Sequence, residues 1–178
     1  YTTATGDQTH PIARADMFVN TRISSEAQKQ ADGTTLDSRA TSKVIKVPVF
    51  TFAGVTTDLK FKDFQSTTAP LSIIRNEELI LLRAEANLGL GNTSLAIQDL
   101  NLIRTSSGTL PAISDPYVAN AALGQPASLL DELLYEKRYS LWHEIGTVWL
   151  DMRHYGKILQ IPRYDPTFRL YDVFPIPE

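Results

Sequence analysis

The sequence predicts a mainly α-helical protein with long irregular loops and one small β-hairpin. Strong helix formers with helical periodicity dominate the chain after Pro70, whereas β-branched and aromatic residues gather in one stretch, at about residues 43–64. The 178 residues, 43% of them hydrophobic, are enough for one domain of ordinary size with a substantial core. We therefore divide the chain into a loop-rich segment, 1–70, and a helical region, 71–178, which we expect to form one structural unit.

The loop-rich segment is predicted to contain two elements. A short helix is predicted near residues 14–20, surrounded by turn-forming polar residues. The hairpin follows, with its turn at Ala53 and Gly54. Pro48 lacks the backbone N–H that a strand ladder uses, so its strand is predicted to lie at an edge or to contain a bulge.

The helical region is predicted to begin with a pair of helices. Ser72 is a candidate cap for a helix over about residues 74–90, which ends in a glycine-rich turn. Asn92 or Thr93 then caps a second helix, whose apolar residues recur on one face. The short turn between them predicts that the two helices pack antiparallel.

A long irregular loop and two further helices are predicted next. The stretch 106–126 contains three prolines and two glycines, and Tyr117 lies within it. Ser128 begins the third helix, with Asp131 completing a shortened capping box, and a fourth helix is predicted over about residues 148–158. The third helix is expected to pack on two sides because it carries two apolar stripes: Leu130, Leu133, Leu134, Leu141 and Ile145 in one, Tyr135, Tyr139 and Trp142 in the other.

Charge and composition exclude several classes of protein. Seventeen Lys and Arg against twenty Asp and Glu give a formal net charge of −3, without the broad basic face that binds nucleic acid or an anionic bilayer. The absence of cysteine excludes thiolate chemistry, cysteine-ligated metals and disulfides. No apolar run approaches the ~18 residues of a membrane span, and the first residues lack the pattern of a secretory signal. A cytoplasmic protein or a processed piece of a longer one is therefore expected.

The motifs for metal and catalytic chemistry are incomplete. His143 and Glu144 match the start of a helical zinc-protease motif, but Thr147 stands where the second histidine would be, so no metal site is expected. Glu136, Glu144 and Asp151 lie close in sequence and could in principle offer the carboxylate pair of a glycosidase, although nothing in their spacing enforces it. We instead predict that four charged residues form ion pairs between two adjacent helices: Glu136, Arg138, Asp151 and Arg153.

Several segments, taken in order, resemble the SusD/RagB family, the surface glycan-binding lipoproteins of Bacteroidota nutrient-uptake systems. The resemblance spans about residues 11–178. Thr147 and Val148 depart from the family pattern, which usually has an arginine just before the tryptophan. We expect this departure to affect the local geometry of the helix and not the family assignment. The segments that carry the resemblance are Asp37, Ser38 and Arg39 with residues 59–62; residues 74–86 with Gly91, Ala96, Leu100, Asn101 and Arg104; residues 134–138; residues 144–146 and 149–156; and residues 174–177.

This resemblance implies tetratricopeptide-like helix pairs and a function without catalysis. The implied function is capture of an oligosaccharide or polysaccharide and its delivery to a SusC-like TonB-dependent transporter. The implied location is the surface of the cell outer membrane, through a lipid anchor. The signal peptide and lipidated cysteine of the family are not in this sequence, so we expect it to be a C-terminal portion of a longer protein. No cofactor, metal or nucleic acid is expected as a partner. Two alternatives stay open: a helical protein–protein interaction scaffold without a sugar site, and a helical glycoside hydrolase.

The glycan-contacting residues are not marked by any family motif, so a physical argument must place them. A sugar ring stacks on an aromatic side chain that is exposed and held still. Trp142 and Trp149 lie among leucines in predicted helices and are expected to pack in the core. Residues of the predicted loops keep a free face, so glycan contact is predicted at Tyr1, Phe18, Arg22 and Tyr117.

Overall fold

The computed structural model describes residues 18–52, 54–63, 66, 72–142, 147–161, 167 and 169–171. Helices account for most of the regular structure in this part of the chain, and one two-stranded antiparallel sheet accounts for the rest. The predicted mainly α-helical fold with a small hairpin is therefore confirmed. None of the described helices is both long and apolar enough to cross a bilayer.

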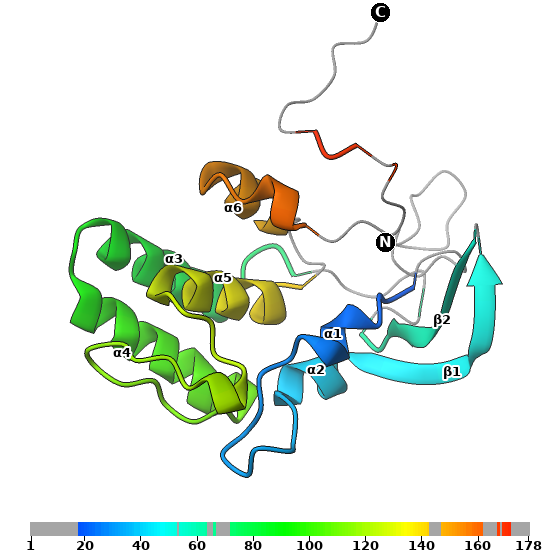
Figure 1. Cartoon of the computed structure of the whole chain (residues 1–178), viewed down its shortest axis with the longest axis horizontal. Helices are drawn as coiled ribbons and strands as arrows, with labels where there is room; N and C mark the ends of the chain where they lie inside the picture. Colours follow the sequence, from blue (N-terminus) through cyan, green and yellow to red (C-terminus); the bar gives the residue numbers. More distant parts are fainter. Residues whose placement is uncertain are drawn as a thin grey trace, which may run out of the picture.

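The larger helices form one side of the molecule. Figure 1 shows α3 (Asn76–Gly89), α4 (Thr93–Ile103) and α5 (Leu129–Ser140) packed together, with α6 (Thr147–His154) above α5. The hairpin lies on the other side, and the short helices α1 and α2 lie between it and the larger helices. Helix α5 is thus placed centrally, where it contacts α2, α3, α4 and α6.

Helices α3 and α4 confirm the predicted antiparallel pair. Their turn contains Gly91 at φ 78°, a left-handed conformation that glycine adopts without steric cost. The caps differ from those predicted, because Arg75 and not Ser72 is the N-cap of α3. Asn92 is the N-cap of α4, but its side chain makes no capping hydrogen bond. The loop that follows α4 begins with the π-helical turn η2 (Arg104–Gly108).

Helix α5 begins as its sequence predicts. The Ser128 hydroxyl accepts a hydrogen bond from the backbone N–H of Asp131 at 3.1 Å and donates one to the Asp131 carboxylate at 2.6 Å. This satisfies one of the unpaired N–H groups at the helix start. Helix α6 is shorter than the predicted 148–158: it ends at His154, Gly156 follows at φ 65°, and η4 (Ile158–Gln160) is a separate 3-10 turn. A left-handed glycine ends a helix in this way.

The hairpin pairs β1 (Val44–Phe52) with β2 (Val55–Phe61) in antiparallel register. Val44 pairs with Phe61 and Phe50 with Thr57, but the register shifts between Lys46 and Phe50. Pro48 lies inside that irregular stretch, as expected for a residue without a backbone N–H. The predicted hairpin and its irregularity are confirmed.

The helix predicted near residues 14–20 is wrong for its last three residues. Residues 18–20 have no regular secondary structure, and residues 14–17 lie outside the described residues. The first helix in the described part of the chain is α1 (Arg22–Ser25). The Asn20 side chain accepts a hydrogen bond from the N–H of Arg22 at 2.9 Å. This bond stabilises a turn at the start of α1, so the helix begins after Asn20 and does not end there. Helix α2 (Ser38–Ser42) follows it.

Two hydrophobic clusters form the core, and α5 contributes to both. The first cluster comprises Leu81, Ala84, Ile97, Leu100, Ile103, Ile113, Leu133 and Leu141. The second, where the hairpin and the short helices meet α5, comprises Val19, Ile23, Ala27, Ala40, Leu59, Phe61 and Tyr139. Because Leu133 and Tyr139 of α5 lie in different clusters, the predicted packing of this helix on two sides is confirmed.

Candidate functional site

A pocket of about 670 Å³ lies between α5, α6 and the loop that precedes α5. This volume is within the range of about 300–1,000 Å³ that small-molecule sites occupy. Aromatic, aliphatic and charged side chains all line it, a mixture typical of sites that orient a ligand with a few polar groups. The lining includes the rings of Tyr135, Trp142 and Trp149, the apolar residues Pro126, Leu134, Val148, Met152, Ile161 and Leu170, and the polar residues Glu26, Asp131, Arg138, Asp151 and Gln160.

Two of the aromatic rings are held by contacts on the core side of α5. The Tyr135 ring stacks on Tyr139 at a centroid distance of 4.3 Å, and its hydroxyl donates a hydrogen bond to Asp37 at 2.8 Å. The Trp142 ring lies 5.0 Å from the ring of Phe61 and packs against the second hydrophobic cluster. The predicted core contact of Trp142 is therefore confirmed, and both rings have little freedom to turn away from a ligand.

Trp149 does not lie in the core, so the prediction for this residue is wrong. It is half-buried on the pocket wall and belongs to neither hydrophobic cluster. Its indole N–H donates to the carbonyl of Tyr171 at 3.1 Å, and the Arg153 guanidinium lies 5.4 Å from its ring centroid. The prediction relied on the apolar residues next to Trp149 in the sequence. Helix α6 is short and packs along α5, and the face that carries Trp149 lies on the pocket.

The charged groups of the pocket form ion pairs. Glu26 accepts from Arg138 at 2.6 Å and also pairs with Arg22. Asp131 pairs with Lys157 at 2.9 Å. Burial alone raises the pKa of the Glu26 carboxyl, but Arg138 and Arg22 outweigh burial and hold that pKa below its usual value. Glu26 is therefore ionised at neutral pH.

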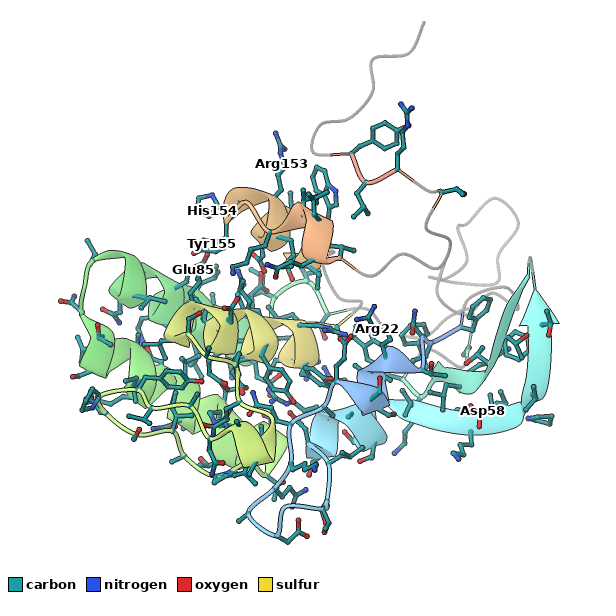
Figure 2. All side chains as sticks on the ribbon, viewed as in Figure 1. Arg22, Asp58, Glu85, Arg153, His154 and Tyr155 are labelled. Atoms are coloured by element: carbon teal, nitrogen blue, oxygen red, sulfur yellow. The ribbon has the colours of Figure 1, made fainter. Side chains whose placement is uncertain are left out.

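Lys137 joins three helices beside the pocket. Its side chain is 5% exposed, and its ammonium donates to Asp151 of α6 at 2.5 Å and to Glu85 of α3 at 2.8 Å. Tyr155 donates its hydroxyl hydrogen bond to the other oxygen of Glu85 at 2.7 Å, and Figure 2 shows these two side chains meeting below α6. Burial raises the pKa of the Asp151 carboxyl, against the opposing effect of Lys137. The position of α6 over the pocket thus depends on one buried ammonium.

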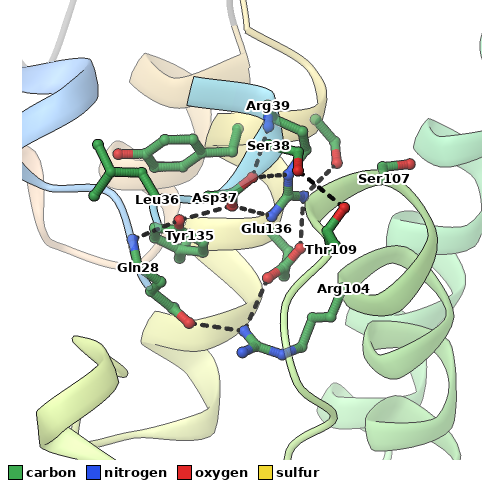
Figure 3. Close-up of polar contacts among 12 residues, drawn as sticks. Gln28, Leu36, Asp37, Ser38, Arg39, Arg104, Ser107, Thr109, Tyr135 and Glu136 are labelled. Carbon is green, nitrogen blue, oxygen red and sulfur yellow. Dashed lines mark hydrogen bonds and ion pairs between the residues drawn. The ribbon is translucent and has the colours of Figure 1, made fainter. Parts of the chain in front are cut away.

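A buried charge network lies behind the pocket wall, on the inner side of α5 (Figure 3). We call it the buried network; its charged members are Asp37, Arg39, Arg104, Glu132 and Glu136. Figure 3 labels all of them except Glu132. Arg39 binds Asp37 through two nitrogens, at 3.0 and 2.6 Å, and Glu136 at 2.6 Å. Although burial lowers the pKa of Arg39, these two carboxylates raise it above its usual value. The Arg39 guanidinium needs a glycine at position 108, because a Cβ there would lie 3.0 Å from one of its nitrogens.

The other half of the buried network is centred on Arg104. Its guanidinium donates to Glu132, to Glu136 at 3.1 Å and to Gln28 at 2.9 Å. Three carboxyl groups therefore share two guanidinium groups inside the protein. Burial raises the pKa of Glu132 to about 7; Arg104 opposes this shift, and the nearby Glu136 carboxylate adds to it. One proton can therefore reside in the buried network near neutral pH.

The structure disperses the four residues predicted to contact glycan. Tyr1 lies outside the described residues. Phe18 packs edge-on against Phe50 of the hairpin, at 5.4 Å, away from the pocket. Arg22 lies at the pocket margin through its ion pair with Glu26, and Figure 2 labels it beside α1. Tyr117 is half-buried behind the pocket, where its hydroxyl donates to the carbonyl of Pro126 at 2.6 Å.

The predicted ion pairs form with different partners. Asp151 does pair between adjacent helices, but with Lys137. Glu136 binds Arg39 and Arg104, and Arg138 binds Glu26, each from a distant part of the chain. Arg153 lies over the Trp149 ring. His143 and Glu144 lie outside the described residues, and no group of three metal-ligating side chains occurs in the part of the chain that the structure describes.

Sequence reasoning missed several pocket residues. Glu26 carries one usable signal, because it lies four residues after Arg22 and such spacing favours an ion pair on a helix. Asp131 was recognised only as part of a helix cap. Gln160 carries no sequence signal: it reaches the pocket from a 3-10 turn that begins where the predicted fourth helix ends, at about residue 158.

Comparison with known proteins gives one match. The model of the SusD family matches residues 2–167, which is nearly the whole chain. No curated protein and no solved structure matches it.

Proposed function

This chain belongs to the SusD family, and we propose that it captures oligosaccharide at the cell surface for delivery to a SusC-like TonB-dependent transporter of the outer membrane. Proteins of this family are glycan-binding components of nutrient uptake, surface lipoproteins and binding proteins rather than enzymes. The observation in this chain that carries the proposal is the pocket between α5 and α6, with three aromatic rings beside polar groups.

The pocket supplies both kinds of contact that a sugar needs. The apolar face of a pyranose ring stacks on an aromatic side chain, while its hydroxyls need donors and acceptors around the edge. Trp142 and Trp149 supply rings, and Gln160 with the carboxylate oxygens of Asp131 and Asp151 supplies polar partners. Arg22, predicted to contact glycan, forms an ion pair with the lining residue Glu26, and we propose it as a contact at the margin of this site.

A binding measurement tests the proposal. We expect the protein to bind members of a panel of neutral and charged oligosaccharides in calorimetry. Trp149→Ala should weaken that binding about tenfold or more, because a lost aromatic contact of about 1.4 kcal/mol corresponds to one decade in Kd. Phe18→Ala is the matched control, because Phe18 was also predicted to contact glycan but packs against Phe50 of the hairpin. It should leave binding unchanged. Weakening by Phe18→Ala alone would move the site to the surface of the hairpin.

Product analysis separates binding from hydrolysis. The pocket contains three carboxylates, Glu26, Asp131 and Asp151, which is the residue type that a glycosidase uses. Each is bound by a cation in this structure, so we propose that they accept sugar hydroxyls and transfer no proton to the glycosidic oxygen. Release of reducing ends from any bound oligosaccharide would contradict this reading. Binding of a peptide and of no glycan would support the interaction scaffold instead.

A further inference from the structure

We propose that this pocket binds a glycan that carries acyl ester groups, such as O-acetyl groups, and selects it over the unsubstituted glycan. The inference rests on the proposed function, since it names the substrate class of the same site. The observation that carries it is one part of the pocket lining, which we call the aliphatic wall; it comprises Leu134, Val148, Met152, Ile161 and Leu170.

The aliphatic wall is assembled from separate segments of the chain. Leu134 comes from α5, Val148 and Met152 come from α6, and the other two residues follow η4. Val148 and Met152 are one helical turn apart, so they lie on the same face of α6. Distant parts of the sequence therefore bring aliphatic side chains to one pocket.

Two ion pairs align α6 with α5. Lys137 of α5 binds Asp151 of α6 at 2.5 Å. Asp131, closer to the start of α5, binds Lys157, which follows the end of α6, at 2.9 Å. The two helices therefore run antiparallel, and α6 lies along α5 in Figure 1. Side chains of both helices can follow the pocket along its length.

A polar group adjoins the aliphatic wall at the Asp131 end of α5. The backbone N–H of Gln160 donates to the carbonyl of Lys157 at 2.8 Å, and Lys157 in turn binds Asp131. Gln160 therefore lies at this end of the pocket, with Ile161 next to it in the chain. Leu134 is one helical turn after Asp131. A ligand here meets an amide and aliphatic side chains together.

The aliphatic wall is apolar surface that the core does not use. Its five residues are half-buried, and none of them belongs to either hydrophobic cluster in the described part of the chain. A ligand in the pocket covers the exposed part of this surface. Each methyl group that the ligand buries there contributes about fourfold to binding. The wall therefore favours a sugar with apolar substituents.

An unsubstituted sugar uses this wall poorly. A hydroxyl turned toward aliphatic side chains loses its water and gains no partner, which disfavours binding. In an acetyl ester the hydroxyl hydrogen is replaced by an acyl group, so the donor is gone and a methyl group lies against the wall. The ester carbonyl accepts a hydrogen bond from the Gln160 amide, and the carboxylates of Asp131 and Asp151 accept from the remaining hydroxyls.

Matched oligosaccharide pairs test the inference by calorimetry. The natural pairs are O-acetylated xylo-oligosaccharides and O-acetylated glucomanno-oligosaccharides, each with the product of its alkaline deacetylation. Every member of the oligosaccharide panel that binds is also compared with its chemically acetylated derivative, so glycans of other types are tested too. In the pair that contains the most tightly bound oligosaccharide, we expect the acetylated member to bind more tightly, by about fourfold or more.

Two variants of the aliphatic wall should remove this preference. Met152→Gln and Val148→Thr each add a polar group at nearly constant size, so each should bring the ratio of the two Kd values toward one and leave binding of the deacetylated member nearly unchanged. Leu150→Gln is the matched control: Leu150 lies on the same helix, is 53% exposed, and is outside the described pocket lining. It should keep the wild-type ratio. Thermal melting checks the fold of each variant, and Val148→Thr is the milder change if Met152→Gln melts early.

The outcomes separate this inference from the function on which it rests. Equal or weaker binding of the acetylated member overturns the inference; if that binding is lost in Trp149→Ala, the glycan site itself stays in place. A preference that persists in both wall variants, or that Leu150→Gln also abolishes, overturns it too, because the acyl group then lies elsewhere. Binding of no oligosaccharide, acetylated or not, overturns the proposed function and the inference with it. Binding of an apolar peptide in that case would assign the wall to an interaction scaffold.

Discussion

Arg104 has no exposed surface, and its guanidinium faces Glu132 and Glu136, which have none either. A buried ion pair adds little to stability compared with well-packed apolar residues, but removing one partner leaves an uncompensated charge. We therefore expect Arg104→Met to lower the free energy of unfolding by about 3–5 kcal/mol, measured by urea denaturation.

The control for Arg104 is an arginine whose ion pair is exposed to solvent. Arg83 binds both oxygens of Asp99, at 2.9 and 2.6 Å, but its side chain is 65% exposed. Solvent screens this pair, so Arg83→Met should have a much smaller effect. Equal losses in the two variants would show that burial does not set the strength of the buried network.

Glu132 makes stability depend on pH. Its pKa is about 7 in the folded protein, against an ordinary value of 4.5, so between these pH values the folded protein holds a proton that the unfolded chain releases. The contribution of this group to stability therefore falls as pH rises from about 4.5 to 7, by roughly 3 kcal/mol in total. The glutamine of Glu132→Gln cannot ionise, so the variant lacks this loss. The free energy of unfolding of the variant minus that of the wild type, measured by urea denaturation, should therefore increase from pH 5 to pH 8.

Glu85 supplies the opposite case for the same experiment. Burial raises its pKa, but Lys137 and Tyr155 outweigh burial and hold it below the usual value. Its stabilising contribution is thus complete above the ordinary pKa of 4.5 and is lost at lower pH. The difference between Glu85→Gln and the wild type should be constant from pH 5 to pH 8. A constant difference for Glu132→Gln as well would contradict the shifted pKa.

At the scale of elements, α6 depends on Lys137 for its attachment. The ammonium connects Asp151 of α6 to Glu85 of α3, and both contacts disappear in Lys137→Met. We expect hydrogen exchange of the α6 amides to accelerate by about tenfold or more, because two carboxylates then repel each other and each 1.4 kcal/mol corresponds to one decade. The amides of α4, which Lys137 does not contact, serve as the internal reference. Unchanged exchange in α6 would mean that apolar contacts alone hold it.

The sequence predicts those elements whose signals are local. Periodicity places α3, α4 and α5 within a few residues, and Ser128 correctly starts α5. Errors arise where a single residue decides a boundary, as Gly156 does in separating α6 from η4. The partners of the buried network follow no local pattern, because Arg39 and Glu136 are 97 residues apart. The pocket was missed for the same reason: its rings come from predictable helices, but the face on which Trp149 lies depends on how α6 packs.

At the scale of the whole molecule, α5 carries both hydrophobic clusters. Leu133 packs in the first and Tyr139 in the second, so neither cluster can lose order without affecting the other. We propose that the described parts before and after residue 70 unfold together. In a Trp149→Phe background, tryptophan fluorescence reports on Trp142 beside the second cluster, and it should give a transition that coincides with the circular dichroism of the helices.

A substitution in the first cluster makes that test stricter. Leu133→Ala should lower stability by about 2–5 kcal/mol, as truncation of a buried leucine does. It should shift the fluorescence and circular dichroism transitions by the same amount, although Trp142 packs against the other cluster. Two separated midpoints would show that the hairpin side and the helical side are independent units.

The buried network also constrains how this sequence can change over evolutionary time. Asp37, Arg39 and Glu136 are bonded in one group with Arg104 and Glu132, so a mutation to a neutral residue at one position strands a charge at another. Such a mutation is tolerated only with a compensating one. Across natural relatives of this chain, loss of the arginine at position 39 should coincide with loss of the acid at 37 or 136, and the pair 39 and 136 would then show correlated substitutions between sites 97 residues apart.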